Sequence, residues 1–90
     1  MYKAKTDKNQ SEIVNALRKV GASVICLHTV GNGCPDLLVG FRGETFLIEV
    51  KTTKGKLTSH QKTVISIWDG RPISVVRTID DALNAIGVQK

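Results

Sequence analysis

The sequence lacks the features that would divide it into several domains or carry it into a membrane. Its 90 residues contain two prolines and no internal repeat, low-complexity tract or proline-rich linker, so we expect one domain spanning residues 1–90. No apolar run approaches the roughly 18 residues that cross a bilayer, and the first residues lack the apolar stretch of a signal peptide. We therefore expect a soluble, cytoplasmic protein with no membrane partner.

Cysteines are also scarce. The chain has two, Cys26 and Cys34, with neither a CxxC spacing nor a second pair, so a disulfide framework and a structural zinc site are both poorly supported. Cys26 lies in an apolar segment and is expected to act as a small core side chain.

Acidic residues are fewer than basic ones. Eight Asp and Glu stand against thirteen Lys and Arg, which gives a net charge of +5 and favours a polyanionic partner, above all nucleic acid. A domain this short buries only a modest fraction of its surface, so a partner subunit is also plausible on size.

Hydrophobic periodicity and turn residues predict seven elements in the order α-β-β-β-α-β-α. They are expected at residues 8–20, 22–28, 36–41, 45–51, 59–68, 73–77 and 79–86. The second and third strands carry apolar residues on both faces, which suggests an α/β fold whose sheet is covered by helices on both sides.

The hairpin formed by these two strands brings two carboxylates together. A turn at Arg42 and Gly43 pairs Asp36 with Glu49, and like charges at directly opposed positions destabilise a sheet. Lys51 emerges on the same face.

Two interpretations of this cluster are open. Lys51 could simply neutralise an exposed pair of acids. Alternatively, Asp36, Glu49 and the carbonyl of Val50 hold a hard cation such as Mg²⁺, which prefers carboxylate oxygens and retains water. Lys51 would then assist an attacking water and offset negative charge on a phosphate.

These residues resemble a known nuclease motif. Pro35-Asp36, followed after twelve residues by Glu49-Val50-Lys51, resembles the PD-(D/E)xK signature. The surrounding strings at 33–39, 46–52 and 57–61 are similar to the VRR-NUC branch, and the resemblance runs from about Glu12 to Arg77. It implies a single-domain, restriction-endonuclease-like αβββαβ core with a mixed central sheet flanked by helices, and Mg²⁺- or Mn²⁺-dependent hydrolysis of DNA.

The resemblance also implies partners and further site residues. In this family an acid on the first helix and a glutamine on the second accompany the core motif, and here these are Glu12 and Gln61. Small stand-alone members, typical of phages and bacteria, are homodimers suited to branched DNA such as four-way junctions. We expect the same here, in a bacterial or phage-infected cell. The rival interpretation is a nucleic-acid-binding module that does not cut, or a subunit of a DNA repair assembly.

Several of these residues also have structural explanations. Glu12 stands third after Asn9 and Gln61 third after Thr58, which are capping-box spacings. Gln61 also falls on the apolar stripe of its helix, where a buried amide needs partners, and this favours a role in the site.

Other side chains are candidates by residue type alone. His28 and His60 are possible acids or bases and are expected to be a strand-end and a solvated side chain. The basic residues expected to contact DNA phosphates are Lys54, Lys56, Lys62 and Arg42.

Overall fold

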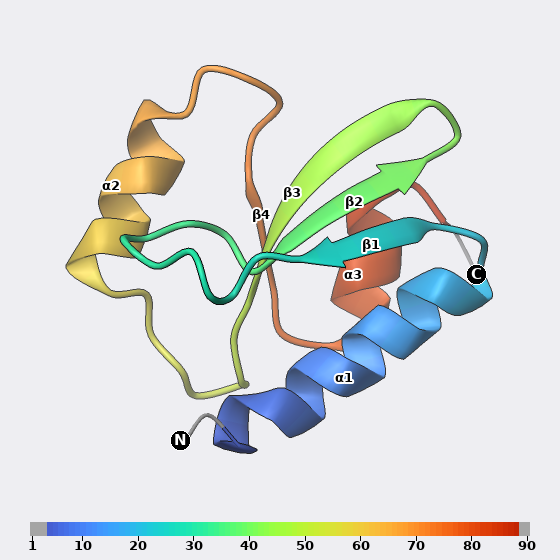
Figure 1. Cartoon of the computed structure of the whole chain (residues 1–90), viewed down its shortest axis with the longest axis horizontal. Coiled ribbons are helices and arrows are strands. Elements are labelled where there is room, and N and C mark those ends of the chain that lie inside the picture. Colours follow the sequence, from blue (N-terminus) through green and yellow to red (C-terminus); the bar gives the residue numbers. More distant parts are fainter. Residues whose placement is uncertain (1–3, 89–90) are drawn as a thin grey trace.

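The computed structural model describes the backbone of residues 4–88 and the side chains of residues 8–88. Seven elements follow the predicted order (Figure 1): α1 (Ala4–Lys19), β1 (Ser23–Cys26), β2 (Leu37–Phe41), β3 (Glu44–Val50), α2 (Ser59–Ile67), β4 (Ser74–Val76) and α3 (Ile79–Ala85). No helix in this part of the chain is long and apolar enough to cross a membrane.

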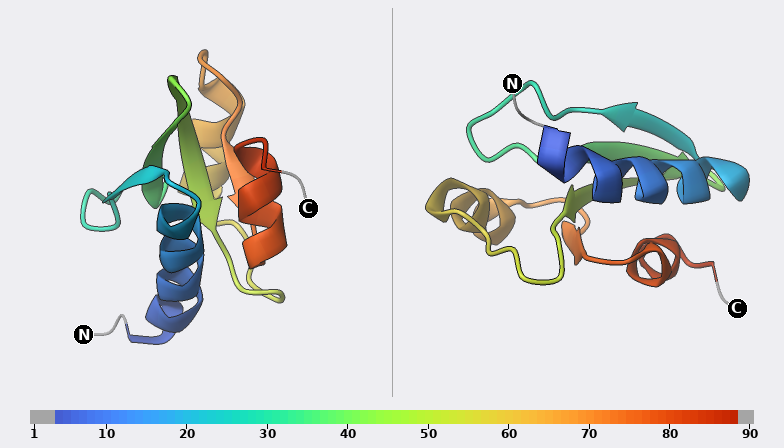
Figure 2. Two further views of the ribbon diagram at one scale, coloured as in Figure 1. Left: turned by 90° about the vertical axis from the view of Figure 1, so that its right-hand side faces the viewer. Right: turned by 90° about the horizontal axis from the view of Figure 1, so that it is seen from below.

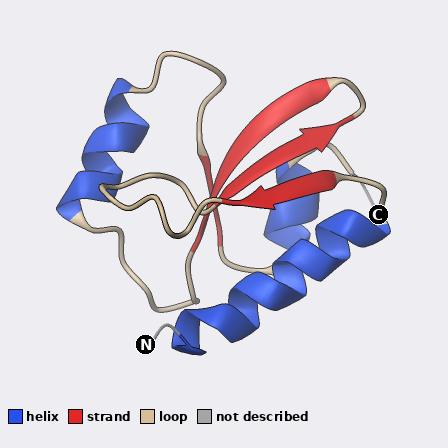
Figure 3. Cartoon of the chain, in the orientation of Figure 1, coloured by secondary structure: helices blue, strands red, loops and turns tan. Residues whose placement is uncertain are grey.

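The strands form one mixed sheet, as predicted, and lie in it in the order β1-β2-β3-β4 (Figure 3). β1 pairs antiparallel with β2, and β2 pairs antiparallel with β3. β4 runs parallel to β3, which requires a long crossover between them. The segment that contains α2 supplies this crossover: the chain leaves the hairpin at the end of β3, forms α2 and returns to the sheet as β4.

A two-residue turn fixes the register of the β2–β3 hairpin. Arg42 and Gly43 both have positive φ angles, of 51° and 82°, the backbone conformation that matches the twist of two antiparallel strands. Leu37 then lies opposite Ile48. This confirms the predicted register, and it places Asp36 and Glu49 at the next position along the hairpin.

The hydrophobic core lies between one face of the sheet and the helices α1 and α3. Alternate residues of the strands point into it. They are buried together with apolar side chains of the two helices and with Ile86, which follows α3: Ile13, Val14, Leu17, Val24, Leu37, Val39, Phe41, Phe46, Ile48, Val76, Ala82 and Ile86.

Helices flank the sheet, but the expectation that they cover both of its faces is wrong. None of the side chains of α2 is buried, and α2 stands apart from α1 and α3 (Figure 2). Ile25, on the face opposite the core, is 58% exposed. The second face carries apolar side chains such as Leu38 and Leu47, which are only half-buried. The sequence pattern therefore overstated how far this face is covered.

Two local expectations are also corrected. α1 begins at Ala4 rather than near residue 8, so Asn9 lies inside the helix and cannot be its cap, and Glu12 cannot complete a capping box there. Cys26 is exposed rather than buried, because it ends an edge strand of the sheet.

Candidate active site

A cavity of about 400 Å³ opens at the end of the sheet where β2 begins and β3 ends. It is lined by polar side chains and backbone from five separate parts of the chain: Asn9, Gln10, His28, Asp36, Glu49, Val50, Lys51, Thr52, Gly55, Lys56 and Gln61. The fold therefore brings together six of the residues singled out from the sequence for a role in the site: Asp36, Glu49, Val50, Lys51, Lys56 and Gln61.

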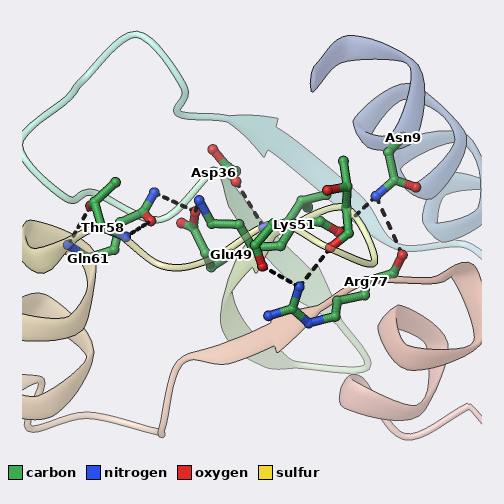
Figure 4. A network of polar contacts seen from close by, with 10 residues as sticks. Asn9, Asp36, Glu49, Lys51, Thr58, Gln61 and Arg77 are labelled. Atoms are coloured by element: carbon green, nitrogen blue, oxygen red, sulfur yellow. Dashed lines mark hydrogen bonds and ion pairs between the residues drawn. The ribbon is translucent and has the colours of Figure 1, made fainter. Parts of the chain in front are cut away.

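Asp36 precedes the first residue of β2 and is tied to the end of β3. Its Oδ2 accepts a hydrogen bond of 2.9 Å from the backbone N–H of Val50, which fixes the carboxylate beside Glu49 (Figure 4). The N–H and C=O of one strand residue project to the same side. The carbonyl of Val50 is therefore directed toward the side on which Asp36 lies.

Glu49 is the buried acid of the site. It is 2% exposed, and its Oε2 accepts a hydrogen bond of 2.7 Å from Nε2 of Gln61. The Lys51 ammonium lies 3.8 Å from the same oxygen. Both contacts use Oε2 of Glu49.

Gln61 makes contacts that agree with both explanations that the sequence left open. Its backbone N–H donates to Oγ1 of Thr58, and its Oε1 accepts from the N–H of Thr58, which forms the capping box of α2. The remaining end of the same amide donates to Glu49. The Gln61 side chain therefore both caps the N-terminus of α2 and donates a hydrogen bond to the buried carboxylate of Glu49.

The backbone of the loop before β2 lies very close to the backbone at the start of α2. A Cβ atom on Gly33 would lie 2.6 Å from the carbonyl oxygen of His60, a distance that real side chains do not tolerate. Gly33 also has a φ of 83°, a conformation favourable only for glycine. The loop before β2 can therefore pack directly against the first turn of α2.

The surroundings of Glu49 raise the pKa of its carboxyl group from the ordinary value of 4.5 to about 7. Burial of the carboxyl group is the largest cause, and the negative charge of Asp36 is the next, while the Lys51 ammonium acts in the opposite direction. Burial, followed by the charges of Asp36 and Glu49, also raises the pKa of the Cys34 thiol. The Lys51 ammonium therefore opposes the rise in the pKa of Glu49 without cancelling it.

The raised pKa predicts how the metal-free protein responds to pH. Because the folded state holds the proton of Glu49 more tightly than the unfolded state, its contribution to stability is complete below pH 4.5 and is lost as the pH rises through about 7. We expect a loss on the order of 2 kcal/mol, less than the full shift would give because the carboxyl group lines an open cavity. Urea unfolding in chelator from pH 5 to pH 8 measures it.

Glu49→Gln is the matched comparison for this experiment, since the amide keeps the shape of the side chain and cannot ionise. The difference in unfolding free energy between the variant and the unmodified protein should grow in favour of the variant as the pH rises. A difference that stays constant with pH would show that Glu49 titrates normally.

Not all the residues singled out from the sequence lie in the cavity. Glu12 points elsewhere on α1, where its carboxylate lies 3.5 Å from Lys8, and it does not line the cavity. Arg42 is at the opposite end of the hairpin, with its guanidinium 4.7 Å from the centre of the Phe41 ring. Lys54 and Lys62 are exposed outside the lining.

Sequence reasoning missed several polar residues at this site. Asn9 and Gln10 reach the cavity from α1, and Thr52 and Gly55 reach it from the loop after β3. His28, expected merely to end a strand, also lines it. The signal for Asn9 was available, because it stands one helical turn before the fully buried Ile13 and so belongs to the inner face of α1.

The donor set suits a hard divalent cation. Two carboxylates and a backbone carbonyl meet in the cavity, and Mg²⁺ commonly binds through one or two carboxylates while keeping several waters. Within residues 8–88 no group of three His, Cys, Asp or Glu side chains gathers as a metal cluster.

The family model described as the VRR-NUC domain matches residues 1–77 of the chain. The match covers both strands of the acidic hairpin, the capping box of α2 and β4. No curated protein and no solved structure matches the chain.

Proposed function

The chain belongs to the VRR-NUC family, and from this premise we propose that it is a divalent-metal-dependent endonuclease that acts on branched DNA. Family membership makes the protein a nuclease, with DNA as its substrate. The observation that carries the metal dependence is that Asp36 lies beside the buried Glu49, whose pKa is raised to about 7 first by burial and then by repulsion from the negative charge of Asp36. A bound Mg²⁺ or Mn²⁺ would relieve that repulsion.

Asp36, Glu49 and the carbonyl of Val50 would hold the ion. Carboxylate oxygens are donors of the kind that Mg²⁺ prefers. When bound, the ion would lower the pKa of a water ligand and offset charge on the scissile phosphate. Glu12 is left out of this set because it pairs with Lys8 outside the cavity.

Lys51 and Gln61 have different tasks in this proposal. The Lys51 ammonium lies beside Glu49 and is able to donate hydrogen bonds to an attacking water or to a phosphate oxygen. Gln61 fixes the orientation of the Glu49 carboxylate through Nε2. The amine therefore acts on the reacting groups, and the amide acts through the carboxylate.

Basic residues beside the cavity support the binding of DNA. Lys56 lines the cavity, and Lys54 is exposed on the same loop. Phosphate contacts by lysines release counterions from DNA, so binding in Ca²⁺, which is expected to support binding without cleavage, should weaken steeply with salt. Arg42, at the far end of the hairpin, would contact a more distant part of a DNA substrate.

Exposed apolar side chains support a homodimer. Ile25, Ile67 and Trp68 are 58%, 71% and 46% exposed, and a second copy of the chain would cover some of this apolar surface in a dimer. A two-fold dimer would present two sites to two strands of a junction. Sedimentation that shows only a monomer at concentrations that support paired junction nicking would contradict this arrangement.

The proposed activity is tested by incubating the protein with labelled four-way junction, flap, single-stranded and duplex DNA. We expect Mg²⁺ or Mn²⁺ to support internal cleavage, with the junction cut fastest, and chelator to abolish it. Cleavage that persists in chelator would contradict the metal site. Equal rates on all four substrates would contradict selectivity for branched DNA, and binding without any cleavage would favour the non-cutting module.

A further inference from the structure

The loop that follows β3 is held by one arginine. Nη1 of Arg77 donates hydrogen bonds to the carbonyl oxygens of Thr52, at 2.7 Å, and Gly55, at 2.6 Å. The N–H of Gly55 donates to the same Thr52 carbonyl at 3.1 Å. Residues 52–55 therefore form a hydrogen-bonded turn whose first and last carbonyl oxygens both contact the Arg77 guanidinium. Figure 4 shows Arg77 beneath Lys51 and Glu49.

Asn9 ties the same region to α1. Its Nδ2 lies within hydrogen-bonding distance of two carbonyl oxygens, that of Lys51 at 3.0 Å and that of Arg77 at 3.4 Å. The N–H of Lys51 in turn donates to the carbonyl of Val76 at 2.9 Å. The exit of β3 is therefore connected to α1, to β4 and, through Arg77, to its own following loop.

These contacts determine where Lys56 lies. Lys56 follows the clamped turn directly and lines the cavity, as do Thr52 and Gly55. The turn carries no buried apolar side chain, so hydrophobic packing does not fix it. The guanidinium presents rigidly placed donors to its two carbonyls, at a smaller entropic cost than a flexible ammonium would pay.

We propose that Arg77 is a positioning residue for DNA binding, which holds the 52–55 turn so that Lys56 faces the cavity and meets a substrate phosphate. This inference rests on the proposed function of the cavity. Arg77 itself acts through the loop, since its side chain is half-buried and two of its donor contacts are taken by the turn.

A double-mutant cycle tests the proposal on the full chain, with junction DNA binding measured in Ca²⁺. Lys56→Ala should lower the affinity about fivefold in the otherwise unmodified protein and less than about twofold in the Arg77→Ala background, since residues that act as one unit are not additive. If Arg77→Ala only lowered the overall stability of the protein, Lys56→Ala would reduce the DNA affinity by the same factor in both backgrounds.

Arg18→Ala is the matched control. Arg18 also donates a partly buried hydrogen bond to a backbone carbonyl, that of Val24, at 3.0 Å, and its removal changes the net charge equally. In that background Lys56→Ala should keep its full effect. Arg77→Lys preserves the charge and is the milder variant if Arg77→Ala folds poorly. We expect it to lose the coupling as well, because the planar donor group is gone.

Hydrogen exchange of the Gly55 amide gives a readout that needs no DNA. Its protection should fall in Arg77→Ala and remain unchanged in Arg18→Ala. An unprotected Gly55 in the unmodified protein, or an additive cycle in a protein that binds DNA, would overturn the positioning role alone. Failure of the unmodified protein to bind any DNA would contradict the proposed function, and the inference with it.

Discussion

Asp36→Asn should reduce DNA cleavage by about three orders of magnitude or more while the protein remains folded. The asparagine carbonyl is still able to accept the hydrogen bond that Val50 gives to Asp36, so the start of β2 keeps its place. What is lost is a charged oxygen ligand for the metal. Single-turnover cleavage of a junction in saturating Mg²⁺ measures the effect, and calorimetry measures the loss of metal affinity.

In chelator the same substitution should be neutral or stabilising, because it removes the charge that opposes ionisation of Glu49. The pKa of Glu49 should fall toward its ordinary value, which carboxyl NMR titration detects. Glu44→Gln is the matched control, since it removes one negative charge from the other end of β3, where Glu44 pairs with Arg71. Cleavage by Asp36→Asn at the rate of this control would remove Asp36 from the site.

Gln61→Glu should also leave a folded protein that is almost inactive. A glutamate oxygen still accepts the hydrogen bond from Thr58 and completes the capping box. At its other end, however, the new carboxylate replaces the amide that donates to Glu49 at 2.7 Å. Two carboxylates at that distance repel each other in a site that must also bind a polyanion, so we expect cleavage to fall by orders of magnitude.

The repulsion between the introduced carboxylate and Glu49 should also lower the stability of the Gln61→Glu variant. In chelator, Gln61→Glu should unfold more easily at pH 8 than at pH 5, because a shared proton relieves the repulsion at the lower pH. Thr58→Ala separates the cap from the carboxylate contact: it should cost about 1 kcal/mol of stability and leave cleavage largely intact. Normal cleavage by Gln61→Glu would confine Gln61 to the cap.

The parts of the site that local geometry determines were predictable from the sequence. The turn at Arg42 and Gly43 fixes the register of the hairpin, and the register alone places Asp36 beside Glu49. The capping box of α2 was likewise a local pattern of four residues. In both cases the residues that interact are close in sequence, so spacing was sufficient.

The rest depended on how distant segments pack. Asn9 and Arg77 contact the exit of β3 from positions 42 and 22 to 25 residues away in the chain, and no local pattern encodes such contacts. The spacing from Asn9 to Glu12 made Asn9 one candidate for the helix cap, yet the helix begins earlier, at Ala4. Glu12 was placed in the site by resemblance, and the rotation of α1 presents Asn9 and Gln10 to the cavity instead.

The mixture of strand directions also bears on the order in which the site assembles during folding. The β2–β3 hairpin closes a short loop, whereas the parallel pairing of β3 with β4 must wait for the whole α2 crossover, at a larger cost in chain entropy. The hairpin alone brings Asp36 to Glu49. We therefore expect the repulsive acidic pair to form early in folding, and the crossover to supply Gln61 and the strand that anchors Lys51 later.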